Sequence, residues 1–292
     1  MTDSNETAAC CAQFYEQDWV QTILGDSFHP GGAELTKRLI NSLSIRKGDY
    51  VLDVACGMGT TTFLVDDQFE AYVTGVDFSE YNIERARGIA LHKEAMVEFK
   101  VGDAQALPVE DSTIDHLICE CAVSTFVDQP AAINDFYRVL KSGGKLAISD
   151  MVLNGELSPK LQTLLAPWTC LASAKTAAGY QRLLLDAGFV VTGYWDESQS
   201  LLDLVLDLKK KLLVAGLGKT LATADGVPDV LASLDISELK TLLDEAKQLV
   251  TDGVVQYCRM TFAKDQPRTS QKPELTLAVT NDQQQCGPGC DC

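Results

Sequence analysis

Between Asp49 and Asp150 the chain repeats one pattern, a short apolar β-rich run followed by a stretch of helical character. Runs that are apolar enough to be buried on both faces belong in a parallel sheet covered by helices. The alternation therefore predicts an α/β doubly wound domain. The runs are YVLDVAC (50–56), AYVTGVD (71–77), VEFKVGD (97–103), DHLICEC (115–121) and GKLAISD (144–150).

The second half of the chain adds two more strands with a helical segment between them. Residues 179–187 predict a helix that stops at Gly188, and FVVTGYW (189–195) predicts a sixth strand. Leucines and valines keep a helical period through much of 197–252, and VVQYCRMTFA (254–263) returns to strand character. We therefore expect a Rossmann-like, mostly parallel seven-stranded sheet with a helical insertion before its last strand.

These patterns divide the chain into five segments. The main α/β domain spans 33–196 and follows an N-terminal cap or lid segment, 1–32. The helical insertion is 197–252, and the final strand of the sheet lies in 253–264. Residues 265–292 are polar and Gln-rich, so we expect a disordered, cysteine-containing tail.

The charge balance excludes several kinds of partner. Lys plus Arg is 24 against 41 for Asp plus Glu, a formal net charge of −17. Such a chain repels phosphate backbones, so we expect no nucleic-acid partner. No apolar stretch reaches the roughly 18 residues of a membrane span, and the start MTDSNETAAC lacks a basic region followed by an apolar one. We therefore expect a soluble, cytoplasmic protein with no membrane partner.

A glycine loop follows the first predicted strand, in VLDVACGMGTTT. Gly57 and Gly59 let the backbone pass close to a ligand, and the helix beyond offers unpaired N–H groups. The second strand ends in Asp77, where a carboxylate can accept both hydroxyls of a ribose. The third strand ends in Gly-Asp103-Ala, an acid placed to meet an adenine amine. A dinucleotide fingerprint needs a third glycine where this chain has Thr62, which weakens an NAD site.

The series D-x-x-C-G-x-G, V-D, G-D-A-x-x-L-P and YRVLKSGGKLAISD resembles the class I S-adenosylmethionine-dependent methyltransferases, over residues 33–196. The resemblance implies that Asp53 and the glycine loop hold the methionine part of S-adenosylmethionine and that Asp77 holds its ribose. It also implies a cofactor site shared by the residues Asp53, Gly57, Gly59, Asp77, Phe78, Asp103, Ala104 and Glu120. Glu120 and Cys121 would lie at its mouth, beside the reactive sulfonium.

Two further segments, CAVSTFVDQP (121–130) and WTCLASA (168–174), resemble the arsenite methyltransferases. In that family a cysteine at each matching place binds trivalent arsenic, which implies that Cys121 and Cys170 bind and present the methyl acceptor. Trivalent arsenic is soft and prefers thiolates. The resemblance implies partners of two kinds: the metalloid substrate, and a thiol reductant such as glutathione or thioredoxin. The alternative is that both cysteines are small apolar core residues.

Other cysteines remain open candidates for arsenic binding. Cys119 shares strand parity with Cys121, so it is either a third thiol at the site or core packing. The terminal thiols either capture metalloid or belong to inert solvated segments; they are Cys10, Cys11, Cys286, Cys290 and Cys292. Arsenite methyltransferases commonly carry another cysteine just after the glycine loop, where this chain has Thr60, Thr61 and Thr62. That departure weakens a three-thiolate pocket.

Two positions near the predicted site have alternative interpretations. HPGG (29–32) is either a turn that starts a helix at Ala33 or a lid whose glycines approach the cofactor. Glu120 is either a cofactor contact or a solvent-facing carboxylate at a strand end. The runner-up function is a methyltransferase for an organic acceptor, with Glu120, His29 or Tyr15 in acid/base or positioning roles. A third alternative is a metalloid-binding protein with an idle methyltransferase fold.

Overall fold

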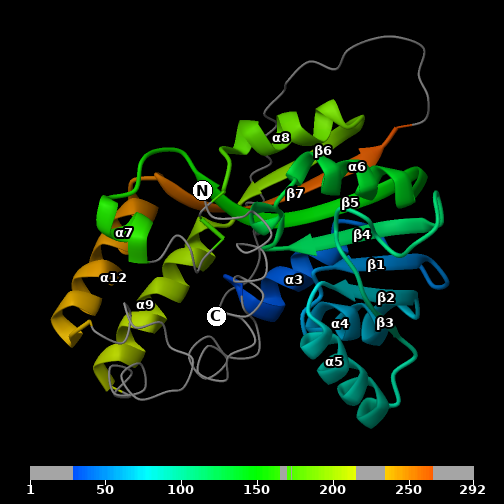
Figure 1. Ribbon diagram of the computed structural model, residues 1–292, viewed down its shortest axis with the longest axis horizontal. Coiled ribbons are helices and arrows are strands. Elements are labelled where there is room, and N and C mark those ends of the chain that lie inside the picture. The colour runs from blue at the N-terminus through cyan, green and yellow to red at the C-terminus, as the bar shows by residue number, and fades with distance from the viewer. Residues whose placement is uncertain (1–28, 165–169, 172, 215–233, 266–292) are drawn as a thin grey trace, which may run out of the picture.

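The computed structural model describes residues 29–164, 170, 171, 173–214 and 234–265. Its seven strands form one sheet in the order β3-β2-β1-β4-β5-β7-β6 (Figure 1). Neighbours among β1 to β5 run parallel, whereas β7 is antiparallel to both β5 and β6. The strands are β1 (Tyr50–Val54), β2 (Tyr72–Asp77), β3 (Glu98–Val101), β4 (Ile114–Glu120), β5 (Leu140–Leu153), β6 (Phe189–Asp196) and β7 (Val255–Lys264). The predicted fold class is confirmed.

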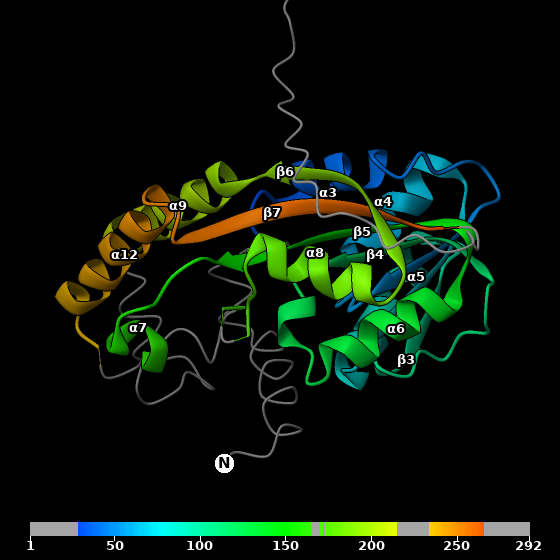
Figure 2. The same cartoon turned by 90° about the horizontal axis from the view of Figure 1, so that it is seen from above.

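Helices cover both faces of the sheet (Figure 2). One face packs against α3, α4 and α5, and the other against α6 and α8, as the two sets of buried side chains show. Within β4, Leu117 and Cys119 belong to one set and Ile118 to the other, which is the period of two expected for a strand buried on both sides. The helices are α3 (Gly32–Asn41), α4 (Thr60–Phe69), α5 (Glu80–Lys93), α6 (Gln129–Val139), α7 (Pro159–Leu164), α8 (Ala177–Asp186), α9 (Ser198–Val214) and α12 (Ile236–Thr251), with a 3-10 turn η1 (Val123–Thr125).

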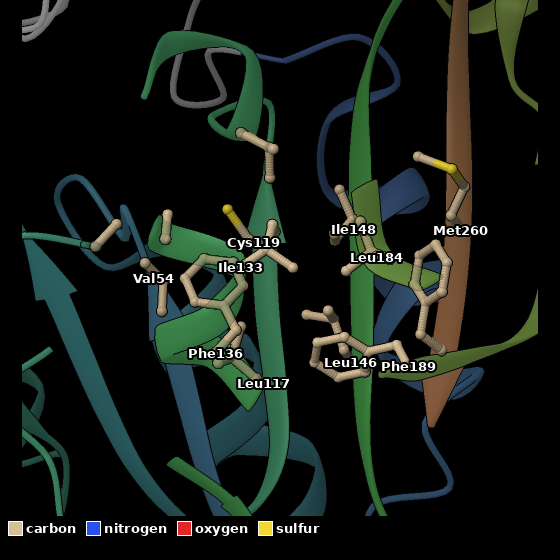
Figure 3. Packing of buried hydrophobic residues seen from close by; sticks show 14 of the residues in the cluster. Val54, Leu117, Cys119, Ile133, Phe136, Leu146, Ile148, Leu184, Phe189 and Met260 are labelled. Carbon is tan, nitrogen blue, oxygen red and sulfur yellow. The ribbon is translucent and has the colours of Figure 1, made fainter. Parts of the chain in front are cut away.

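The larger buried cluster lies between the sheet and helices α6 and α8 (Figure 3). Phe136 and Ile133 of α6 meet Leu117 and Cys119 of β4, and Phe189 of β6 packs on the same side. Each of these side chains is completely buried. Burying such a side chain stabilises the fold by about 1.5–3 kcal/mol relative to leaving it in water, so this cluster anchors the strands whose ends carry the site.

Helices α9 and α12 lie side by side next to α7, beyond the end toward which β4 points (Figures 1 and 2). Lys209 of α9 forms an ion pair with Asp244 of α12. Leu201 of α9 and Leu242 of α12 belong to a second buried cluster with Leu35 of α3. The helices that follow β6 in sequence therefore form a wall beside the carboxyl ends of the parallel strands.

Most strands begin or end a few residues away from the predicted runs, and two of these differences have a clear physical cause. β5 begins at Leu140, four residues before the predicted run, because Leu140 already pairs with Ile114 across a bulge. β4 ends at Glu120, since Cys121 has a φ of 51° and turns the chain out of the strand. Within the described ranges, none of the helices is both long and apolar enough to cross a bilayer.

Candidate functional site

The glycine loop has the backbone conformation that its two glycines allow. Gly57 has φ +53° and Gly59 has φ +87°, and Gly59 is the N-cap of α4. A Cβ on Gly59 would lie 2.5 Å from the Phe99 ring, so a side chain is excluded there. A Cβ on Gly57 would meet no atom within 4 Å. The space over Gly57 is open, which lets the backbone approach a ligand at the helix N-terminus.

Two carboxylates end the neighbouring strands. Asp77, at the end of β2, accepts hydrogen bonds from the amides of Gly57 (2.8 Å) and Ser79 (2.9 Å). A carboxylate oxygen can accept more than one hydrogen bond, so a ligand hydroxyl can bind to the same group. The next residue, Phe78, is 56% exposed. Beyond β3, Asp103 accepts from the amide of Gln105 at 2.9 Å, and Ala104 is buried. An acid for a ribose, an exposed aromatic residue and an open glycine loop together fit a nucleoside with a charged extension.

Asp53 lies beneath this loop rather than in it. Its carboxylate is 2% exposed and accepts a 2.7 Å hydrogen bond from the Thr62 hydroxyl, which ties β1 to α4. Burial raises the pKa of Asp53 to about 7, although the Thr62 hydrogen bond opposes that shift. A carboxyl group of this kind gains its charge only near neutral pH.

This burial leads to a pH prediction. The folded state holds the Asp53 proton more tightly than the unfolded chain, whose carboxyl has an ordinary pKa, so folded stability should fall as pH rises from about 4 to about 7. Asp150, whose pKa burial raises to about 6, acts in the same direction. In urea denaturation, the free energy of unfolding of Asp53→Asn should therefore rise relative to that of the parent by up to about 4 kcal/mol between about pH 4 and about pH 7. A stability difference that stays constant with pH would contradict the assignment.

Glu120 is the centre of a buried polar network, so of its two alternatives the solvent-facing carboxylate is wrong. Its side chain is 7% exposed and accepts hydrogen bonds from Thr61 (2.7 Å) of α4 and Thr36 (3.1 Å) of α3. His29 Nε2 lies 3.5 Å from the same carboxylate and 3.2 Å from the Thr36 hydroxyl. Glu120 therefore joins the end of β4 to both helices that border the glycine loop.

The HPGG segment starts a helix and also lines a cavity. α3 begins at Gly32, one residue before the predicted start, and its N-cap Gly31 has φ +79°. A Cβ on Gly31 would lie 2.7 Å from Leu35 Cβ. A cavity of about 550 Å³ separates this turn from α9; it is lined by His29, Gly31, Gly32, Ala33, Glu34, Arg38, Thr60, Ser200, Asp203, Leu204 and Asp207. Its position beside Thr60 places it next to the glycine loop.

Replacing Glu120 by alanine should weaken the contact between the end of β4 and helices α3 and α4. Two buried threonine hydroxyls and His29 would lose a charged partner, which we expect to lower the free energy of unfolding by about 2 kcal/mol and to weaken cofactor binding. Urea denaturation and calorimetric titration measure the two effects. Glu34→Ala, which removes an exposed ion pair with Lys37 on the same helix, is the control and should unfold like the parent. Equal behaviour of the two variants would contradict the role of Glu120.

Cys121 and Cys170 are in direct contact. Their sulfur atoms are 3.2 Å apart, and the Cys170 thiol also donates to the Cys121 carbonyl at 2.9 Å. Cys121 is half-buried and Cys170 is 4% exposed. The hydrogen bond with Cys170 and burial raise the pKa of Cys121 well above its ordinary value. The two residues, 49 apart in the chain, therefore form a contacting pair of thiols just beyond the end of β4.

The other candidate cysteines do not join this pair in the described structure. Cys119 is completely buried with Val54, Ile133 and Phe136 (Figure 3). Cys170 belongs to the cluster with Leu35, and Cys121 packs against that cluster. The turn at Cys121 accounts for the separation, because it ends the alternation of the strand. Among the described residues no group of three or more His, Cys, Asp or Glu has a metal-binding arrangement. Five candidate thiols and Tyr15 lie outside the described residues; the thiols are Cys10, Cys11, Cys286, Cys290 and Cys292.

Sequence reasoning missed the threonines. Thr36, Thr61 and Thr62 hold the two carboxylates Glu120 and Asp53. At the sequence level, Thr60 to Thr62 were considered only as positions that lack a cysteine or, at Thr62, a third glycine. The available signal was a run of three threonines at a helix start opposite two strand-end acids. Tyr257 of β7, which lies in the cluster of the thiol pair, was missed as well, since no motif surrounds it.

Comparisons with known proteins agree with this geometry. The sequence profile of the family described as "Methyltransferase domain" matches residues 45–204. A phosphoethanolamine N-methyltransferase of Triticum aestivum is 33% identical over 131 residues, 44% of this chain but only 26% of the wheat protein. An arsenite methyltransferase of Halobacterium salinarum is 34% identical over 146 residues, 49% of this chain and 37% of that protein.

Similarity of fold extends further along the chain. The structure of Haemonchus contortus phosphoethanolamine N-methyltransferase 2, solved with phosphomonomethylethanolamine and S-adenosylhomocysteine, superposes with a TM-score of 0.70 at 19% identity. The superposition covers 88% of this chain and 58% of the nematode protein. The matched profile spans more than half of the chain and includes the glycine loop, Asp77, Asp103 and the end of β4. This chain therefore belongs to the methyltransferase-domain family, and its cofactor is S-adenosylmethionine.

Proposed function

We propose that this protein is an S-adenosylmethionine-dependent methyltransferase whose acceptor is trivalent arsenic, as arsenite or methylarsenite, held by Cys121 and Cys170. The observation that carries the proposal is the 3.2 Å contact between the two sulfurs at the carboxyl end of β4. Two thiols this close can bind one ion together, and a soft thiophilic ion is the kind that selects them. The similarity to the haloarchaeal arsenite methyltransferase supports the same acceptor.

The binding step needs no outside reagent. Each As–S bond replaces an As–OH bond of arsenous acid, and the thiol proton leaves with the hydroxide as water. Exchange of two thiols for two hydroxides thus releases two water molecules without a change in net charge. The raised pKa of Cys121 is compatible with this exchange, because Cys121 starts in its protonated form.

The residues around the pair serve alignment and exclusion of water. S-adenosylmethionine, when bound, supplies an electrophilic methyl group. Leu35 and Cys170 belong to one buried cluster with Leu201 and Leu242 of the helical wall, which keeps the acceptor side apolar. Glu120 holds α3 and α4 together between the glycine loop and the thiols. Fixing donor and acceptor in one geometry is itself a large part of the rate enhancement in such a transfer. A thiol reductant such as glutathione or thioredoxin would keep the pair reduced.

A second candidate acceptor is a small organic amine. The cavity beside α3 is lined by three carboxylates, those of Glu34, Asp203 and Asp207, which complement a cation. The similarity to the wheat phosphoethanolamine N-methyltransferase supports this class. In this alternative, Cys121 and Cys170 are packing residues.

A panel of acceptors tests the two candidates against each other. The full chain would be incubated with S-adenosylmethionine labelled in its methyl group, a small excess of reduced thiol, and either arsenite, methylarsenite, phosphoethanolamine or ethanolamine. We expect label in methylated arsenic, separated by chromatography with mass detection, and none in the amines. Label in an amine with none in arsenic would replace the first candidate by the second.

A further inference from the structure

Asp150 of β5 is a completely buried carboxylate that holds the turn after β4. One of its oxygens accepts a hydrogen bond from the Ser124 amide at 2.9 Å, and the other accepts from the Ser124 hydroxyl at 2.7 Å. The amide of Met151 donates to the same carboxylate at 2.7 Å. Since Ser124 is the middle residue of η1, these hydrogen bonds fasten η1 to the neighbouring strand β5.

The chain that enters η1 is strained at Cys121. Its φ of 51° is a left-handed backbone conformation, which is unfavourable for a residue with a Cβ. Such strain persists only where the surrounding structure holds it, and it is concentrated at functional sites. Here β5 holds the backbone at two points: the Ser149 carbonyl accepts the Cys121 amide at 2.7 Å, and Asp150 binds Ser124 three residues later. The restraint therefore covers the whole turn.

We propose that Asp150 is a positioning residue of the acceptor site: by holding η1, it keeps Cys121 in the conformation that brings its sulfur against Cys170. The inference rests on the proposed function, which makes these two thiols the acceptor site, and adds a residue to it. The sulfurs are 3.2 Å apart, and the Cys170 thiol also donates to the Cys121 carbonyl at 2.9 Å. Both contacts depend on the backbone at Cys121. Without the anchor, this backbone would relax toward a more favourable φ and the thiols would separate.

The test measures how readily the two thiols join. The full chain would be equilibrated with mixtures of reduced and oxidised glutathione and quenched with acid, and the Cys121–Cys170 disulfide would be quantified by peptide mass spectrometry. The two thiols lose two electrons and two protons to oxidised glutathione, which becomes two reduced molecules. The equilibrium constant is therefore the effective concentration of one thiol at the other. Asp150→Ala should lower this constant about tenfold, because effective concentration depends steeply on orientation.

Two further variants separate placement from charge and from general loss of structure. Asp150→Asn removes the negative charge but still offers an oxygen to the Ser124 amide, so it should keep most of the parental constant. Asp135→Ala removes another carboxylate that holds a loop amide, that of Leu107 at 2.6 Å, and should leave the constant unchanged. A parental constant in Asp150→Ala, or an asparagine variant as low as the alanine variant, would overturn the inference.

Ser124→Ala keeps the test valid if Asp150→Ala does not fold, as judged by circular dichroism and cofactor binding. It removes only the hydroxyl bond to Asp150 and should lower the constant about threefold, the equivalent of one weak hydrogen bond. An unchanged constant would overturn the inference. The glutathione equilibrium needs no arsenic. Unchanged constants in a protein that methylates arsenite therefore overturn this inference alone, and lowered constants in variants of a parent that methylates no arsenic overturn the proposed function alone.

Discussion

Replacing either Cys121 or Cys170 by serine is expected to abolish arsenite methylation while leaving S-adenosylmethionine binding intact. Each variant keeps the shape of the site but leaves one thiol where the structure has two in contact. Loss of a single supporting group commonly costs about 10–100-fold in metal affinity, so loss of a ligand should cost about 100-fold or more. Chromatography of arsenic species measures the activity, and calorimetric titration measures cofactor binding.

Cys258→Ala is the matched control for these variants. Cys258 is also completely buried, but it packs in a different buried cluster from the thiol pair. We expect this variant to methylate arsenite like the parent, with a modest loss of stability from the smaller side chain. Substantial methylation by either serine variant would show that one thiol is enough and would contradict the two-thiol site.

Gly59→Ala should be the most damaging change on the cofactor side. Its backbone has φ +87°, which costs a non-glycine residue about 1–2 kcal/mol. The new Cβ would also lie 2.5 Å from the Phe99 ring, an overlap that typically costs another 1–3 kcal/mol. We therefore expect the free energy of unfolding to fall by about 3 kcal/mol, and cofactor binding to weaken at least tenfold as the loop shifts. Urea denaturation and calorimetric titration provide both values.

Comparing Gly57→Ala with Gly59→Ala separates the effect of the overlap with Phe99 from the cost of the positive φ. Gly57 also has a positive φ, but a Cβ there meets no atom within 4 Å. Its stability loss should be limited to the backbone cost of about 1–2 kcal/mol. If Gly59→Ala were no less stable than Gly57→Ala, the Phe99 contact would not restrict the loop as described.

Much of the fold follows from local sequence periodicity. The alternation in β4, with Leu117 and Cys119 on one face and Ile118 on the other, follows from a period of two and needs no knowledge of partners. The start of β5 was not predictable in this way, because Leu140 enters the sheet through a bulge opposite Ile114. A bulge depends on the partner strand, which the local sequence of 140–144 does not contain.

The sequence predicted the residues of the site only where they belong to a recognisable motif. Gly57, Gly59 and Asp77 occur in short patterns with a physical reason, and the structure brings them together. The hydrogen bonds of Glu120 come from Thr61 and Thr36, 59 and 84 residues away, and Tyr257 meets Ser149 across 108 residues. Such contacts depend on the packing of whole helices and strands. Cys121 and Cys170 were paired only through a family resemblance, since no periodicity links positions 49 residues apart.

X-ray absorption at the arsenic edge, on protein loaded with less than one equivalent of arsenite, tests the central claim most directly. The protein would carry serine at the five terminal cysteines, so that the pair at 121 and 170 is the site under study; the replaced residues are Cys10, Cys11, Cys286, Cys290 and Cys292. We predict at least two sulfur neighbours on the bound arsenic, one fewer in Cys170→Ser, and methylarsenic after S-adenosylmethionine is added. Arsenic bound only to oxygen, or a sulfur count that Cys121→Ser and Cys170→Ser leave unchanged, would contradict the claim.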